Sequence, residues 1–97
     1  MLCYDISDDK KRMKIHRLCT NYGWIMVQKS LYLKGGILTR EKDSLMKQIK
    51  KIDLKYPNIF DSIVFINVAS NQLRTADQIG YEFPFSSFLG DSRLEII

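Results

Sequence analysis

This chain of 97 residues has little cysteine and no glycine-rich loop. Its two cysteines, Cys3 and Cys19, are too few for a disulfide framework, and neither has a second Cys or a His at metal-ligand spacing. Both lie in apolar patterns and are predicted to be small core residues. Gly35-Gly36 is predicted to be a turn, because the Lys-Ser/Thr of a phosphate-binding P-loop is absent. Disulfide scaffolds, zinc sites and P-loop chemistry are therefore excluded.

Long hydrophobic runs are also missing, so no membrane span and no membrane partner are expected. The start of the chain has no basic region, apolar stretch and small-residue cleavage site in series, so we expect no signal peptide and a cytoplasmic protein. The hydrophobic content of 45% with 27% charged residues is that of an ordinary globular protein. The length predicts a single domain, small enough for a partner subunit to contribute much of the stability.

Acidic residues are scarce except near the end of the chain. Residues 1–75 hold fourteen of the fifteen Lys and Arg and seven of the eleven Asp and Glu, which gives +7. Residues 76–97 hold one Arg and four acids, which gives −3. The basic body suits a polyanion, and the acidic tail suits a protein contact.

Hydrophobic periodicity predicts two helices, at 8–22 and 39–52 with Thr39 as N-cap, each preceded by a strand. The strand at 24–33 can bend and count as two, and the strand at 62–68 is apolar enough to be central. Residues 69–80 are predicted to be a connector with one helical turn. The remaining predicted elements are a strand at 81–85, confined to an edge by Pro84, a loop at 86–92 and a short strand at 93–97.

This order predicts an α+β fold, a ferredoxin-like βαββαβ sandwich with additional C-terminal strands and both helices on one face. The other face would expose Val64, Ile66 and Trp24, which predicts a homodimer packed sheet to sheet. Residues 1–80 would form the core. Residues 81–97 would supply edge strands and a tail for dimer or partner contacts.

Asp5 stands where an apolar strand ends and a basic helix begins. A buried, unpaired carboxylate is costly, so Asp5 needs a cation, a hydrogen-bond cluster or solvent. The simpler interpretation, that Asp5 caps the helix, is weakened because Ser7 or Asp8 suits that position better. Two Asp5 carboxylates on a two-fold axis could hold Mg²⁺ for phosphodiester cleavage, or Asp5 could only tune a contact at the dimer axis. The chemistry leaves both interpretations open.

A row of cations, Lys10, Lys14 and Arg17, recurs at helical spacing on the face opposite the predicted core, flanked by Lys11 and Arg12. The row lacks acids at i+4, so a phosphate-binding track and a merely solvated face are both open interpretations. The single histidine beside it, at position 16, has no Asp or Cys partner at spacing and is interpreted as a surface residue.

Two segments resemble a known family. They are Tyr4-Asp5-Ile6-Ser7-Asp8-Asp9-Lys10-Lys11-Arg12 and Val27-Gln28-Lys29-Ser30-Leu31-Tyr32. Their order and separation are similar to the CRISPR-associated Cas-two family, over residues 1–35 and in overall length. The sequence departs from the family pattern at Lys14, where Arg is common, at Met26, where a basic residue is frequent, and at Tyr32, where Phe is usual.

The resemblance implies a homodimeric adaptation protein that binds duplex DNA, joins the Cas-one integrase in capturing spacers and, in several members, cuts RNA or DNA with a divalent metal. Asp5 matches the family's metal-site aspartate, and Mg²⁺ is the implied cofactor. Arg12 matches the helix arginine. Single-stranded RNA is a second implied substrate.

Two rival hypotheses are weighed beside it: a stand-alone metal-dependent RNase of the toxin type, and a small regulatory module that binds a metabolite. The basic body and the missing ligand pocket argue against the metabolite module.

Overall fold

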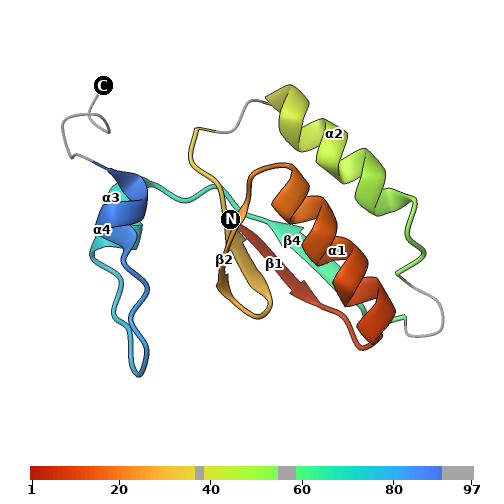
Figure 1. The fold of residues 1–97 in the computed structure, drawn as a ribbon, viewed down its shortest axis with the longest axis horizontal. Helices are drawn as coiled ribbons and strands as arrows, with labels where there is room; N and C mark the ends of the chain where they lie inside the picture. Colours follow the sequence, from red (N-terminus) through yellow and green to blue (C-terminus); the bar gives the residue numbers. More distant parts are fainter. Residues whose placement is uncertain (37–38, 55–58, 91–97) are drawn as a thin grey trace. The chain divides into compact units, whose positions relative to one another are not determined.

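The computed structural model describes residues 1–36, 39–54 and 59–90, and the chain forms two compact units, Met1–Ile66 and Asn67–Ile97 (Figure 1). The elements in chain order are β1 (Leu2–Asp5), α1 (Asp9–Asn21), β2 (Ile25–Gln28), β3 (Leu31–Leu33), α2 (Thr39–Lys50), β4 (Ser62–Phe65), α3 (Ser70–Arg74) and α4 (Phe85–Leu89). Among the described residues, every helix is too short or too polar to cross a membrane.

The first unit is a four-stranded antiparallel sheet with strand order β2-β3-β1-β4. The register places Cys3 of β1 between Leu31 of β3 and Val64 of β4. Because side chains alternate across a strand, these three residues share one face, and Leu2 with its partner Tyr32 points to the other. The chain therefore has the α+β fold that the sequence predicts.

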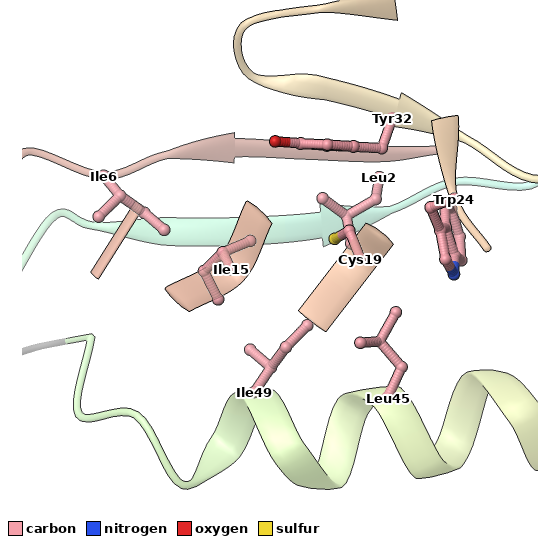
Figure 2. Close-up of a cluster of buried hydrophobic side chains, with 8 residues drawn as sticks. All are labelled: Leu2, Ile6, Ile15, Cys19, Trp24, Tyr32, Leu45 and Ile49. Atoms are coloured by element: carbon pink, nitrogen blue, oxygen red, sulfur yellow. The ribbon is translucent and has the colours of Figure 1, made fainter. Parts of the chain in front are cut away.

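Both long helices pack on the face that carries Leu2 and Tyr32. In Figure 2, Ile15 and Cys19 of α1 lie between the strands and the core residues of α2. The buried cluster consists of Leu2, Ile6, Ile15, Cys19, Trp24, Tyr32, Leu45 and Ile49. Burial raises the pKa of the Cys19 thiol to about 12, so this thiol stays protonated and unreactive at neutral pH.

Helix α1 begins and ends with local signals that the sequence carries. Asp8 is the N-cap, and its carboxylate accepts a hydrogen bond of 2.9 Å from the Lys11 amide. At the other end Gly23 has a φ of 82°, and the amides of Gly23 and Trp24 donate to the carbonyls of Thr20 and Cys19. This is the Schellman motif, which stops the helix and directs the chain into β2.

Two expectations about the sheet are wrong. Among the described residues, β4 lies at an edge of the sheet and not in its centre, because it pairs with β1 on one side and with no described strand on the other. Its apolar residues face two ways: Ile63 and Phe65 pack against the core, and Val64 is 50% exposed on the open face. Trp24 is buried rather than exposed, with 5% of its surface accessible. Its ring packs edge to face against the ring of Phe65, with the two centroids 6.0 Å apart.

The described part of the second unit contains two short helices instead of the predicted edge strand. Residues 81–84 form no strand, and α4 begins at Phe85, one residue after Pro84. The amide of Phe88 donates a hydrogen bond to the Pro84 carbonyl. The centroid of the Phe83 ring lies 5.0 Å from that of Phe85 and 5.9 Å from that of Phe88. This cluster of three rings brings Phe83, Phe85 and Phe88 together. The helical structure that allows it replaces the strand predicted at 81–85. The strand expected at 93–97 lies outside the described residues.

Candidate nucleic-acid interface

Asp5 is the last residue of β1 and pairs in register with Ser62 of β4. By alternation it shares the open face with Cys3 and Val64. Its side chain is exposed, and within the described part of the chain its carboxylate has no hydrogen bond or ion pair. The neighbouring acids are engaged, since Asp8 caps α1 and Asp9 pairs with Arg12. Asp5 is therefore the carboxylate of this segment that is available to a ligand.

A buried aspartate that the sequence analysis missed fixes the turn after Asp5. Asp61 is 9% exposed, and both of its carboxylate oxygens lie 3.2 Å from the amide nitrogen and the hydroxyl of Ser7. The contact joins the start of β4 to the β1–α1 turn. The sequence carries only a weak indication of this contact, because an Asp just before a strand is common in ordinary turns.

The predicted cation row lies on the exposed face of α1. Lys10, Lys14 and Arg17 are exposed, and none of them forms a salt bridge with another described residue. We call these three residues the α1 stripe. The two flanking cations contact their own chain: the Lys11 ammonium donates to the Asp53 carbonyl, and Arg12 pairs with Asp9 and donates to the Ile6 carbonyl at 3.3 Å.

A hollow of about 710 Å³ opens between α1 and the strands β1 to β3. The His16 Nδ1 atom lies 2.9 Å from the Tyr32 hydroxyl at its floor, and the Tyr4 hydroxyl donates to the Lys29 carbonyl at 2.7 Å. Burial is the main cause that raises the pKa of Tyr32, so its hydroxyl remains protonated. His16 is half-buried here and is not the plain surface residue that the sequence suggested.

The described residues of a single chain do not by themselves form a complete metal centre. Among the described residues, no three His, Cys, Asp or Glu side chains come together in a way that could hold a metal ion. Asp5 nevertheless offers the hard oxygen ligands that Mg²⁺ prefers, and Mg²⁺ needs only one or two protein carboxylates. Asp5 supplies one such carboxylate, and a second would have to come from another copy of the chain.

A family model described as CRISPR associated protein Cas2 matches residues 1–76. The chain belongs to this family. No match was found among curated proteins or among solved structures.

The family match confirms the resemblance seen in the first two strands and the first helix, and gives this Cas2 family protein a CRISPR-related role. It favours that hypothesis over the toxin-type RNase and the metabolite module. The assignments of Asp5 as a catalytic and metal-binding residue, and of Lys10, Lys11, Arg12, Lys14 and Arg17 as nucleic-acid ligands, stay predictions. So does the division of the chain after residue 80.

Proposed function

We propose that this Cas2 family protein acts in CRISPR adaptation as a homodimer that binds duplex DNA along α1 and bridges subunits of the Cas-one integrase. The family membership supports the CRISPR-related role, and the three exposed cations of the α1 stripe support the binding of duplex DNA along α1. Cleavage of RNA or DNA is a secondary activity in this proposal.

The α1 stripe has the dimensions of a short phosphate track. Lys10 and Arg17 are seven residues apart, which corresponds to about 10 Å along a helix. That length covers about three phosphate steps of one DNA strand. Three exposed cations on one face, none of them paired with a described acid, would contact successive phosphates without reading the base sequence.

The open face of the sheet supports the homodimer. Ile25, Val64 and Ile66 are 44%, 50% and 44% exposed, and Val64 lies beside Cys3 in the sheet. An apolar sheet face of this kind favours burial against a second copy. The element order β1-α1-β2-β3-α2-β4 with strand order β2-β3-β1-β4 supports the ferredoxin-like description.

Asp5 stands at the end of this apolar face, so a two-fold axis through the face would bring two copies of Asp5 toward one another. These two carboxylates would hold the Mg²⁺. When bound, the ion supplies charge stabilisation and activates water for phosphodiester hydrolysis. The residues of this chain contribute the carboxylates, and the α1 stripe orients the nucleic acid beside them.

Reversal of the α1 stripe tests the DNA-binding proposal. A variant with Lys10→Glu, Lys14→Glu and Arg17→Glu is titrated with duplex DNA over a series of salt concentrations. If the stripe makes three phosphate contacts, the slope of log affinity against log salt should fall by about 2.7 units, since each contact contributes about 0.9.

The matched control reverses the same number of charges on α2 and the turn after it, with Lys47→Glu, Lys50→Glu and Lys51→Glu. These three side chains are also exposed. The control should keep most of the affinity. Equal losses in the two variants, or an unchanged slope after reversal of the stripe, would refute the proposed binding surface.

A further inference from the structure

Two charged side chains hold the two ends of one peptide group after β1. The carbonyl of Ile6 accepts a hydrogen bond from the Arg12 guanidinium at 3.3 Å. The amide of Ser7 donates to both carboxylate oxygens of Asp61 at 3.2 Å. This carbonyl and this amide belong to the same planar peptide bond, because Ser7 follows Ile6 directly. The peptide group therefore cannot rotate without breaking one of the two contacts, and we call this arrangement the Ile6–Ser7 clamp.

The charges of the clamp match the polarity of the peptide group. The cationic guanidinium faces the carbonyl oxygen, and the anionic carboxylate faces the amide hydrogen. Hydrogen bonds that involve an ionised group are roughly twice as strong as neutral ones. Asp61 also accepts from the Ser7 hydroxyl at 3.2 Å. These contacts offset the cost of burying the Asp61 carboxylate, which would be large without hydrogen bonds.

The clamp lies at the end of β1, next to Asp5. Asp5 pairs with Ser62, the residue that follows Asp61, and this is the last pair in the register of β1 with β4. Local opening costs the least free energy at such ends, where secondary structure frays. Between Asp5 and the clamped peptide stands only Ile6, whose side chain is buried in the core. The clamp therefore holds the chain at the point where the sheet alone would let it fray.

Asp5 depends on this backbone for its position. Within the described part of the chain its carboxylate has no hydrogen bond or ion pair. A ligand side chain without such contacts is aimed only by the chain that carries it, and a functional side chain needs a precise position. Loss of the groups that support a metal ligand typically lowers the metal affinity 10–100-fold.

We propose that Asp61 is a positioning residue, which together with Arg12 fixes the Ile6–Ser7 peptide and so holds Asp5 in place to receive a divalent cation. Asp61 acts through the backbone and does not contact the ion. This inference rests on the proposed function, in which two copies of Asp5 hold Mg²⁺.

Binding of Mn²⁺, which takes the same oxygen ligands as Mg²⁺, tests the proposal without a cleavage assay. The electron paramagnetic resonance signal of free Mn²⁺ gives the dissociation constant, and Asp5→Asn shows which part of the binding belongs to Asp5. Asp61→Ala should raise this dissociation constant by at least about tenfold. Asp61→Asn keeps an acceptor for the Ser7 amide but loses the charge, so it should show a smaller loss of affinity in the same direction.

The matched control is Gly23→Ala, which should lower the free energy of unfolding at the other end of α1 and leave the clamp intact. It should bind Mn²⁺ as tightly as the wild type, because a general loss of stability does not move Asp5 in the folded molecules. Urea denaturation checks that each variant is folded under the conditions of the assay. If Asp61→Ala does not fold, Asp61→Asn decides, and an unchanged affinity in that variant overturns the inference.

Backbone order measured by NMR in the absence of metal is the second readout. The order parameters of Asp5 and Ser7 should be about 0.85 in the wild type, as in a rigid backbone, and should fall towards about 0.6 in Asp61→Ala. Gly23→Ala should leave both values unchanged.

A folded Asp61→Ala that keeps either the wild-type affinity for Mn²⁺ or the wild-type order at Asp5 overturns the inference and leaves the proposed metal site intact. An equal loss of affinity in Gly23→Ala also overturns it, because the effect is then one of general stability. Equal Mn²⁺ binding by the wild type and by Asp5→Asn means instead that the metal part of the proposed function fails. The order parameters then decide alone: loss of order at Asp5 in Asp61→Ala supports the clamp, and unchanged order overturns it.

Discussion

Four aspartates, Asp5, Asp8, Asp9 and Asp61, lie in or contact the segment at the start of α1, and they differ in the partners of their carboxylates. Asp8 caps the helix, Asp9 pairs with Arg12, and Asp61 holds Ser7 from a position 54 residues along the chain. Asp5 alone among these four has no described partner for its carboxylate. Structural roles therefore account for three of the four, and a ligand role is open to Asp5.

At this scale we predict that Asp5→Asn abolishes Mg²⁺-dependent cleavage of RNA or DNA while duplex binding is retained. The amide has the same shape but lacks the charge that a Mg²⁺ ligand supplies. Cleavage by the purified variant should equal that of the wild type in EDTA. Its free energy of unfolding should stay within about 0.5 kcal/mol, since an exposed side chain with no described partner is altered.

The control for this experiment is Asp43→Asn, an exposed acid on α2 that should keep full activity. Equal Mg²⁺-dependent cutting by the wild type and by Asp5→Asn would place the activity at another site. Absence of cutting by both would favour the bridging role alone.

Among the secondary-structure elements, α1 positions most of the candidate interface. Its buried face carries Ile15 and Cys19, its exposed face carries the α1 stripe, and the face between them lines the hollow. The helix stops at Gly23, whose φ of 82° is unfavourable for any residue with a Cβ atom. A Cβ there would also lie 2.9 Å from the Lys34 ammonium nitrogen.

We therefore predict that Gly23→Ala lowers the free energy of unfolding by about 1–2 kcal/mol, the usual cost of the left-handed conformation for an L-residue. Urea denaturation followed by circular dichroism measures this loss. Gly35→Ala is the matched control, because a Cβ at Gly35 would meet no atom within 4 Å and the φ of this glycine is not in the left-handed region. An equal effect of both substitutions would show that the Schellman motif contributes little.

At the scale of the whole molecule, the open face of the sheet is the apolar surface that the described residues leave exposed. We predict that Val64→Glu converts the proposed homodimer into a monomer, because a charge in the middle of an apolar interface would have no partner there. Sedimentation or light scattering measures the mass. The control Lys47→Glu places the same acid on the outer face of α2 and should leave the mass unchanged.

A monomeric wild type would contradict the homodimer directly. A dimeric Val64→Glu variant would show that the interface lies on another surface, and it would also remove the argument for two copies of Asp5 on one axis.

Local patterns in the sequence determined the two long helices, the ends of α1 and the position of Asp5 at the end of β1. Caps and apolar periodicity act over a few residues, so they can be read without knowledge of the distant chain. The family motif was readable for the same reason, because its two segments are contiguous and lie in residues 1–35.

Only the tertiary structure decided the contacts between distant segments. It placed β4 at the edge, buried Trp24 against Phe65, joined Asp61 to Ser7 and brought His16 to Tyr32. It also formed α4 where the alternation of Tyr81, Phe83 and Phe85 had predicted a strand. Each outcome depends on which segments the folded chain brings together, and the burial gained there outweighs the weak local preference of the sequence.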